Sequence, residues 1–178
     1  ISVGEIRDGE TASIAMRAAI TGHLVFSTLH TNDAVSAVYR LKDVGVEPWL
    51  VASALRGVVS QRLLRKVCPH CKKGYQPSAE ELALLGMPED SHVTFYKGEG
   101  CPECHHSGYV GRRAAFEILM LNGRLRRLIS EGANEEQLTE EARKNGFRSM
   151  RESCRRLVLE GVTSAEEAAR IINTTVDE

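Results

Sequence analysis

Two polar side chains directly follow short apolar segments, where an open α/β sheet places groups that act on a ligand. Glu5 follows the segment 1–4, and His30 follows the segment 24–29. Ligands of such sheets bind just beyond the carboxyl ends of the strands. We therefore expect Glu5 and His30 to face one ligand together. A carboxylate there can take a proton from water or hold a magnesium-bound water, and a histidine can stabilise a terminal phosphate.

Each of these residues, taken alone, has a more ordinary explanation. A glutamate after a strand is more often a helix cap or a surface acid, and a histidine there is more often a polar residue with satisfied hydrogen bonds. The surrounding sequence decides between the two interpretations.

Four of the five cysteines form two Cys-x-x-Cys pairs, Cys68/Cys71 and Cys101/Cys104. Two residues between ligands let both sulfurs of a pair reach one metal, and four thiolates close a tetrahedral zinc shell. No secretory signal is visible, so metal binding in a reducing compartment is favoured over disulfides. We predict a structural zinc site. Incidental or redox-active thiols and an iron–sulfur cluster are the alternatives.

Several residues near these pairs carry no predicted chemistry of their own. The four cysteines already complete a shell, so we expect the neighbouring histidines to be solvated. The fifth cysteine, Cys154, has helical spacing to Met150 and Leu157, and we expect it to be buried as a small apolar residue. The neighbouring histidines are His70, His105 and His106.

The composition is ordinary for a soluble globular protein. The 178 residues, 42% hydrophobic and 26% charged, suffice for one medium domain or two small ones. The net charge of −1 gives no global argument for nucleic acid or an anionic membrane as a partner. No apolar run approaches the roughly 18 residues that span a bilayer. The first residue is Ile1, so we interpret the chain as a fragment or a processed product.

Periodicity and capping patterns predict the elements that position these groups. We expect strands at 1–4, 24–29, 58–64 and 112–121. Residues 67–107 hold the paired cysteines and four of the five prolines, and we interpret them as an inserted module. Capping boxes are expected at Ser78/Glu81, Asn134/Gln137 and Thr163/Glu166. The expected helices are 8–20 with Asp8 as N-cap, 33–45, 48–55, 123–131, 135–145, 149–160 and 164–172.

Five segments together resemble one family, the type II secretion and type IV pilus assembly traffic ATPases (the GspE/PilB group). Residues 3–12, VGEIRDGETA, resemble the family's Walker B end, and residues 21–34, TGHLVFSTLHTNDA, resemble its histidine box. The two cysteine pairs are similar to the tetracysteine subdomain of the assembly-type members, and residues 109–119, YVGRRAAFEIL, to the segment that follows it. Retraction-type relatives lack the cysteines, so the chain resembles the extension or secretion branch.

The resemblance implies a RecA-like α/β core within a hexameric ATPase at the cytoplasmic face of the inner membrane. Platform proteins of a secretion or pilus system would be its partners, with ATP, magnesium and zinc as cofactors. By position, Glu5 would be the catalytic carboxylate and His30 would contact the γ-phosphate region. The residues associated less directly with nucleotide or magnesium are Arg7, Asp8, His23 and Thr31.

The chain departs from the family pattern at the phosphate-binding loop. No G-x-x-x-x-G-K-[ST] run occurs in it, so we expect a carboxy-terminal half that does not hydrolyse ATP alone. The expected parts are a RecA-like core part (1–66), the zinc subdomain (67–107), a return strand (108–121) and a helical carboxy-terminal subdomain (122–178). A standalone zinc-binding interaction module is the alternative function.

Two arginine groups occur in the predicted carboxy-terminal helices. A solvated mixed-charge face is the ordinary interpretation, with pairing to Glu131, Glu152 and Glu160. A subunit interface or a nucleotide contact is the alternative. The groups are Arg124, Arg126 and Arg127, and Arg151, Arg155 and Arg156.

Overall fold

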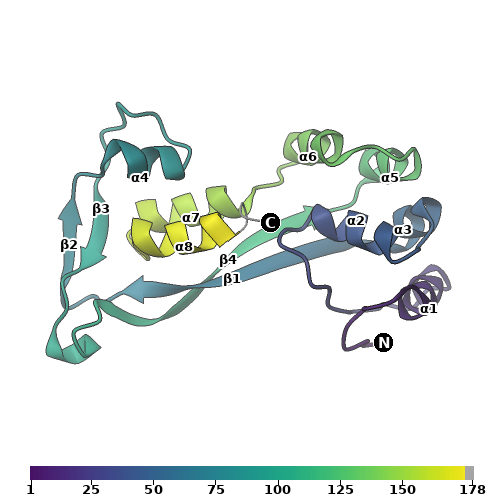
Figure 1. The fold of residues 1–178 in the computed structure, drawn as a ribbon, viewed down its shortest axis with the longest axis horizontal. Coiled ribbons are helices and arrows are strands. Elements are labelled where there is room, and N and C mark those ends of the chain that lie inside the picture. The colour runs from purple at the N-terminus through teal and green to yellow at the C-terminus, as the bar shows by residue number, and fades with distance from the viewer. Residues whose placement is uncertain (175–178) are drawn as a thin grey trace. The chain divides into compact units, whose positions relative to one another are not determined.

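The structure is a computed structural model that describes residues 1–174, and it mixes helices and strands as the α/β prediction requires (Figure 1). The chain forms two compact units. Unit 1 combines Ile1–Ser60 with Ile118–Phe147, and unit 2 combines Gln61–Glu117 with the residues from Arg148 onward. The predicted division at 66, 107 and 121 follows motifs and remains a proposal. It does not coincide with the two units, because the helices after residue 122 are shared between them.

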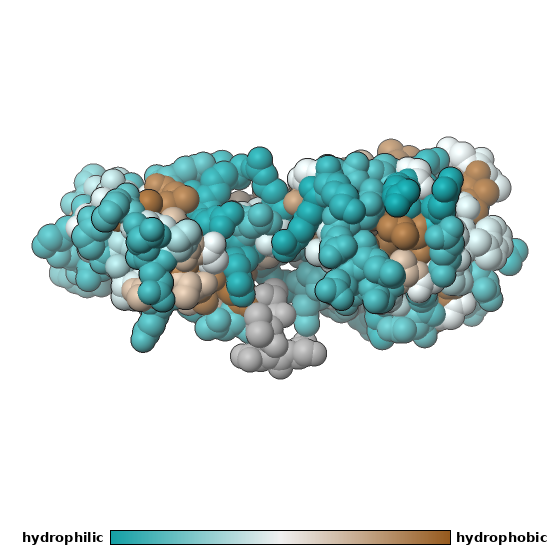
Figure 2. Space-filling model, turned by 90° about the horizontal axis from the view of Figure 1, so that it is seen from above, coloured by the Kyte–Doolittle hydropathy of each residue, from teal (hydrophilic) through white to brown (hydrophobic). Residues whose placement is uncertain are grey.

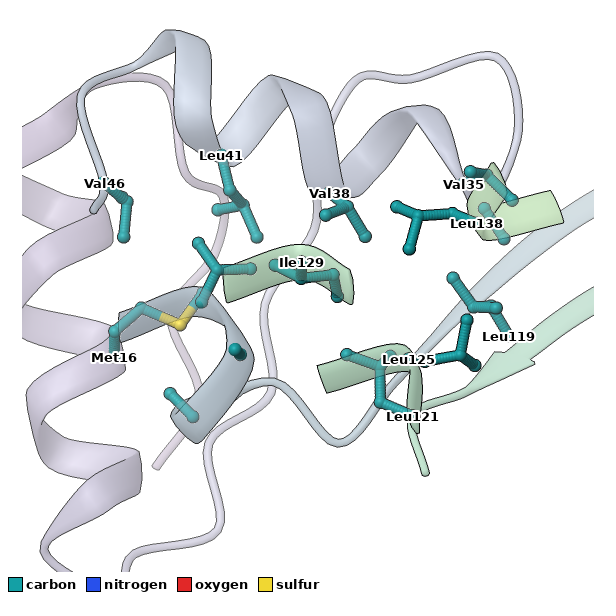
Figure 3. Close-up of a cluster of buried hydrophobic side chains, with 14 of the residues drawn as sticks. Met16, Val35, Val38, Leu41, Val46, Leu119, Leu121, Leu125, Ile129 and Leu138 are labelled. Atoms are coloured by element: carbon teal, nitrogen blue, oxygen red, sulfur yellow. The ribbon is translucent and has the colours of Figure 1, made fainter. Parts of the chain in front are cut away.

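Unit 1 is mainly helical, and its core is built from the apolar faces of its helices. Val38 and Leu41 of the second helix, and Ala34 in the turn before it, are all at most 1% exposed. Figure 3 shows Val38 and Leu41 beside Ile129 in one cluster of buried side chains. The helices of this unit are α1 (Gly9–Ile20), α2 (Ser36–Asp43), α3 (Pro48–Ala54), α5 (Gly123–Ser130) and α6 (Glu135–Lys144).

Local capping explains where these helices begin. The Asp8 carboxylate accepts from the Thr11 N–H at 2.8 Å, as expected of the predicted N-cap. Asn134 and Gln137 form the predicted capping box of α6. Helix α2 begins later than predicted, because Asp33 accepts from the Ser36 N–H at 2.7 Å in a turn that precedes the helix.

The segments predicted as strands at 1–4 and 24–29 run parallel but join through a single bridge, Ser2 to Phe26. The Val3 N–H donates to the Phe26 carbonyl at 2.8 Å, and the Ile6 N–H to the Thr28 carbonyl at 3.0 Å. The prediction of strands at 1–4 and 24–29 is therefore wrong for this structure. Phe26 is 65% exposed, and a parallel pair without covering layers lacks the burial that normally extends such a ladder.

Two long strands begin in one unit and end in the other. Strand β1 (Gly57–Val67) pairs with β4 (Tyr109–Met120), and their arrows point in opposite directions in Figure 1. Strand β1 extends the predicted strand 58–64 at both ends, and β4 begins three residues before the predicted strand 112–121 and ends one residue before its end.

Unit 2 contains an antiparallel hairpin of β2 (Lys72–Tyr75) and β3 (Phe95–Gly98). Its core includes Leu64, Phe95 and Cys154, each fully buried, so the prediction for Cys154 is confirmed. The remaining elements of this unit are α4 (Ala79–Leu84), the 3-10 helix η1 (Pro102–Cys104), α7 (Met150–Leu159) and α8 (Ala165–Thr174).

Two of the three predicted capping boxes are confirmed, and the third is displaced by one residue. Ser78 and Glu81 cap α4 as predicted. At the start of α8 it is Ser164, not Thr163, whose hydroxyl accepts from a helix N–H, that of Glu167. Thr163 instead donates its hydroxyl to the carbonyl of Arg65, a residue of β1, at 2.8 Å. This tertiary hydrogen bond replaces the predicted cap.

Three of the six arginines in the two arginine groups, Arg124, Arg155 and Arg156, pair with a glutamate. Arg155 pairs with Glu152 at 3.9 Å, and Arg156 with Glu160 at 3.7 Å. Arg126 instead donates to the Ala52 carbonyl at 2.7 Å, at the end of α3.

The helices of the described residues are short or only partly apolar. Within residues 1–174, no helix has the length and hydrophobicity that crossing a membrane requires. The face seen in Figure 2 is mainly hydrophilic, and its hydrophobic residues lie in small separate patches.

Candidate functional site

Glu5 and His30, predicted to face one ligand, are in direct contact. His30 Nε2 lies 3.1 Å from Glu5 Oε2. The second Glu5 oxygen, Oε1, pairs with Arg7 Nη2 at 2.5 Å. Both oxygens of the carboxylate therefore have a cationic or hydrogen-bonding neighbour.

The parallel bridge between the two segments places these side chains. Thr28 donates its hydroxyl to the Gly4 carbonyl at 2.8 Å, one residue before Glu5. Ile6, one residue after Glu5, is 6% exposed and belongs to the core of unit 1. Contacts thus fix the backbone on both sides of Glu5, while the Glu5 side chain contacts His30, 25 residues further along the chain.

The electrostatics favour an ionised Glu5 on an open surface. The hydrogen bond from Arg7 lowers the pKa of the Glu5 carboxyl, with a further contribution from His30. The side chain of Glu5 is 33% exposed, that of Arg7 74% and that of His30 85%. A solvent-facing carboxylate can orient water or a cation. For Glu5 to do so, Arg7 and His30 must first move away from its carboxylate oxygens.

The other residues predicted to act on nucleotide or magnesium contact their own turns. Asp8 caps α1, and its hydrogen bonds with Thr11 lower its pKa. His23 Nδ1 lies 3.3 Å from the Ala18 carbonyl at the end of the same helix. Thr31 donates to the Asp33 carbonyl at 3.1 Å. The structure thus brings Glu5, His30 and Arg7 together, and it gives Asp8, His23 and Thr31 local partners.

The four paired cysteines meet in one cluster in unit 2, with all four sulfurs within 4.8 Å of one another. The sulfurs of Cys68 and Cys101 are 3.9 Å apart, as are those of Cys71 and Cys104, while Cys101 and Cys104 are 3.7 Å apart. Four thiolates placed tetrahedrally at 2.3 Å from zinc would be about 3.8 Å apart. The cluster therefore fits a four-coordinate metal ion.

Backbone N–H groups contact the sulfurs of this cluster. Gly100 donates its N–H to Cys71 Sγ at 3.3 Å, and Gly108 donates to Cys104 Sγ at 3.2 Å. Burial raises the pKa of the Cys104 thiol, but the N–H groups of Cys101 and Gly108 outweigh this and bring it to about 6. Burial raises the pKa of Cys71 to about 11 in spite of the Gly100 N–H, and it also raises the pKa of Cys101. Amide bonds to the sulfurs are the supporting contacts that orient metal ligands.

The chain around the cluster is tightly folded. A Cβ on Gly98 would lie 2.1 Å from the Gly108 carbonyl oxygen, so only glycine permits this approach. His105 and His106 both have positive φ, 50° and 60°. They are exposed, as is His70, in agreement with the prediction that the histidines are solvated.

A match to known proteins assigns this arrangement to a family. The family model described as Type II/IV secretion system protein matches residues 1–170. The chain belongs to this family.

Relatives in both secretion and pilus systems are equally similar. Type II secretion system protein E of Pseudomonas aeruginosa is 47% identical over 171 residues, which are 96% of this chain and 34% of that protein. The type IV pilus assembly ATPase PilB of Thermus thermophilus is 47% identical over 169 residues, 94% of this chain and 19% of that protein. The chain thus spans about a third or less of these family members.

Solved structures confirm the predicted RecA-like α/β fold. The pilus retraction motor PilT, solved with bound ADP, matches 96% of this chain and 38% of its own, with a TM-score of 0.64 and 28% identity. The ATPase DotB of Legionella pneumophila matches 98% of this chain and 38% of its own, with a TM-score of 0.63 and 21% identity.

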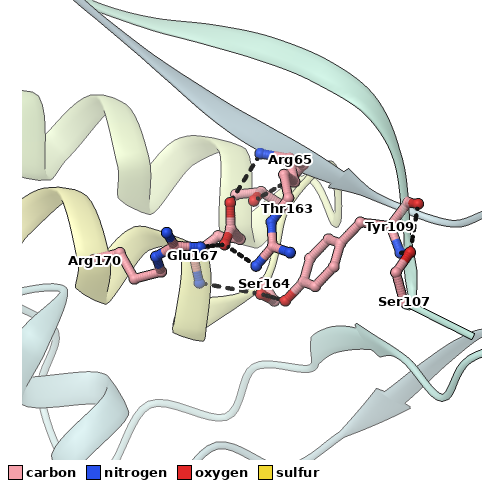
Figure 4. A network of polar contacts seen from close by, with 7 residues as sticks. All are labelled: Arg65, Ser107, Tyr109, Thr163, Ser164, Glu167 and Arg170. Atoms are coloured by element: carbon pink, nitrogen blue, oxygen red, sulfur yellow. Dashed lines mark hydrogen bonds and ion pairs between the residues drawn. The ribbon is translucent and has the colours of Figure 1, made fainter.

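One polar network of this family member was not predicted (Figure 4). Glu167, buried on α8, accepts from the Arg65 backbone N–H at 3.0 Å and from its guanidinium at 2.5 Å. The Arg65 guanidinium also lies 4.2 Å above the Tyr109 ring, and Arg170 donates to Glu167 at 3.0 Å. Arg65 and Glu167 are 102 residues apart, and no local pattern relates them.

Proposed function

We propose that this chain is the carboxy-terminal catalytic part of a hexameric ATPase that couples ATP hydrolysis to pilus or pseudopilus assembly and protein export. The contact between Glu5 and His30 carries the proposal. It joins the residues that the family resemblance assigns to catalysis, although they lie 25 residues apart in the chain. The names of relatives support the activity: the Vibrio cholerae protein, 44% identical, is a type II secretion system ATPase.

In the proposed mechanism, Glu5 orients the attacking water and accepts its proton, and His30 contacts the terminal phosphate. Magnesium would neutralise phosphate charge when bound. Arg7 and His30 neighbour the carboxylate in the structure, so a phosphate that attracts these basic groups would free Glu5 for water. His23, Thr31 and Asp8 would support the site through the turns that they hold.

The phosphate cradle is the component that this sequence lacks. Backbone amides and a lysine of a phosphate-binding loop hold the phosphates in such ATPases, and no such loop occurs among the 178 residues. We therefore propose that the chain alone does not turn over ATP.

The tetracysteine cluster would hold structural zinc. The sulfur spacing and the amide contacts support this metal, and a closed thiolate shell leaves no position for a substrate. The family match over residues 1–170 extends far beyond the cluster, which favours the ATPase over a standalone zinc-binding module. We place the protein at the cytoplasmic face of the inner membrane, with platform proteins as partners and no specific nucleic acid.

The test is ATP turnover by the complete gene product with Glu5→Gln. Because a general base contributes roughly 100- to 10,000-fold, the variant should lose at least about 100-fold in kcat with little change in nucleotide affinity. Glu10→Gln, the same substitution at an exposed position of α1, is the matched control. Unchanged turnover in Glu5→Gln would contradict the proposed role. Metal-dependent turnover by the purified 178-residue chain would contradict its proposed inactivity.

A further inference from the structure

Thr28 is bonded to both chain neighbours of Glu5. Its hydroxyl donates to the Gly4 carbonyl at 2.8 Å, and its carbonyl accepts from the Ile6 N–H at 3.0 Å. One residue of the second apolar segment therefore holds the backbone directly before and directly after the proposed catalytic carboxylate.

The two bonds lie where the parallel pairing of the segments loses its regular register. The Val3 N–H donates to the Phe26 carbonyl at 2.8 Å. In a regular parallel ladder the next N–H to cross is two residues further on, that of Glu5. It is instead the Ile6 N–H that reaches the next carbonyl facing it, that of Thr28. The first segment thus contains one extra residue, a bulge, and bulges redirect side chains, often beside active sites.

The Thr28 side chain supplies a hydrogen bond that the ladder does not provide at this bulge. A bulge leaves backbone groups without ladder partners, and the Gly4 carbonyl obtains its donor from the Thr28 hydroxyl. A valine at this position would have nearly the same shape but no donor. The Glu5 side chain is 33% exposed, so the hydrogen bonds of its neighbours add to the limited burial that holds it in place.

His30 lies in the same short segment as Thr28. Leu29, between them, packs against the core of unit 1, while Thr28 and His30 are exposed. His30 Nε2 lies 3.1 Å from Glu5 Oε2. The consecutive residues 28–30 therefore contact both the backbone around Glu5 and its side chain.

We propose that Thr28 is a positioning residue that holds Glu5 in the one register that places its carboxylate beside His30. Thr28 touches none of the reacting atoms in this role and acts through Glu5. The inference rests on the proposed function, because it concerns the reaction in which Glu5 accepts a proton from water. Position matters for such a group, since a misplacement of roughly 1 Å can cost about 100-fold in rate.

The test is ATP turnover by the complete gene product with Thr28→Val. This variant loses the hydroxyl donor and keeps the shape of the side chain, so kcat should fall at least about 10-fold while KM for ATP changes less than about 2-fold. Thr28→Ser retains the donor and should keep at least about half of the turnover. Thr94→Val, the same substitution at an exposed position of unit 2, should turn over like the unmodified protein.

A double-mutant cycle with Glu5 separates positioning from a general loss of structure. Because Thr28 acts through the Glu5 carboxylate, Thr28→Val should change kcat by less than about 2-fold in a protein that already carries Glu5→Gln. A structural defect would instead lower the residual turnover of Glu5→Gln by the same factor as that of the unmodified protein.

Amide hydrogen exchange of the 178-residue chain tests the geometry without ATP. Thr28→Val should speed the exchange of the Ile6 N–H at least about 10-fold, because the bulge loses one of its two bonds to Thr28. The Val3 N–H, which bonds to Phe26 before the bulge, should exchange within about 2-fold of its original rate. Thr28→Ser should protect the Ile6 N–H as the unmodified chain does.

Four results would overturn the inference. They are unchanged kcat in Thr28→Val, an equal loss of turnover in Thr28→Ser, the same factor of loss in the Glu5→Gln background, and unchanged exchange of the Ile6 N–H. A loss of turnover in Glu5→Gln with none in Thr28→Val would refute this inference alone. Unchanged turnover in Glu5→Gln would refute the proposed function, and the exchange of the Ile6 N–H would then decide whether Thr28 holds the Glu5 backbone.

Discussion

The tetracysteine cluster and the Glu5–His30 pair differ in how they are assembled and in how water reaches them. The cluster closes within a small module, with Cys68 and Cys104 buried and glycine amides directed at the sulfurs. The Glu5–His30 pair joins two segments through one bridge, and the His30 side chain is 85% exposed. Changes at the cluster should therefore damage the fold, whereas changes at the pair should alter chemistry and leave stability intact.

Replacing a metal ligand should have the largest effect. Cys104→Ser removes one thiolate, and loss of the metal should lower the free energy of unfolding of unit 2 by roughly 5 kcal/mol. Elemental analysis should find zinc falling from about one ion per chain to near zero, and chemical denaturation measures the loss of stability.

Cys154→Ser is the matched control for this change. It places a hydroxyl in the core of unit 2 and should cost about 2 kcal/mol while zinc is retained. Purified wild-type protein without zinc would contradict the assignment of the cluster.

Breaking the half-buried ion pair of Arg65 and Glu167 in unit 2 should have the next largest effect. Glu167→Ala leaves the Arg65 guanidinium without its carboxylate. The Arg65 side chain is 41% exposed and solvent screens its charge, so the cost should be about 2 kcal/mol. Glu166→Ala, at the exposed neighbouring position, should change stability by less than about 0.5 kcal/mol. Equal effects in the two variants would show that the network of Figure 4 does not stabilise the unit.

The same pair predicts a pH dependence of stability. Burial raises the pKa of Glu167, but its hydrogen bonds with Arg65 outweigh this and lower the pKa below the ordinary value of 4.5. The native state then favours the ionised form, so its contribution is complete above pH 4.5 and is lost as the pH falls through the lowered pKa. Glu167→Gln should flatten this part of the stability profile measured by denaturation, and an unchanged profile would contradict the assignment.

Blocking the close approach of Gly98 to Gly108 should lower the stability by an intermediate amount. In Gly98→Ala the new Cβ meets a backbone oxygen at 2.1 Å, and the required backbone shift should cost about 2 kcal/mol. Gly123→Ala is the control, because nothing lies within 4 Å of its Cβ position, and it should stabilise by about 0.5 kcal/mol. A thermal unfolding midpoint unchanged in Gly98→Ala would contradict the close approach.

The smallest change in stability is expected when the exposed contact between Arg7 and Glu5 is removed. Arg7→Ala removes the hydrogen bond that lowers the pKa of Glu5, so that pKa should rise toward its ordinary value while the unfolding midpoint stays constant. Carboxyl carbon NMR during a pH titration measures the change. Arg17→Ala, an exposed position of α1, should leave Glu5 unaffected, and an unshifted Glu5 in Arg7→Ala would contradict the contact.

Local features of the fold followed from the sequence. The caps at Asp8, Ser78 and Asn134 depend on residues three positions apart, and all three occur as predicted. The Cys-x-x-Cys spacing likewise located the cysteine cluster, because each pair needs only one turn of chain to bring its two sulfurs together. Thr163 was misassigned because its hydroxyl binds the Arg65 carbonyl of a distant strand instead of a helix N–H.

Sequence patterns alone determined the family, the four clustered cysteines, the helices and the residues that end the two apolar segments. Only the tertiary structure decided that Glu5 pairs with Arg7 as well as His30, that 1–4 and 24–29 share one bridge, and that Arg65 meets Glu167. The reason is how far apart in the sequence the interacting residues are. Capping and paired-ligand geometry act within one turn of chain, whereas ion pairs and strand ladders depend on groups that only folding brings together.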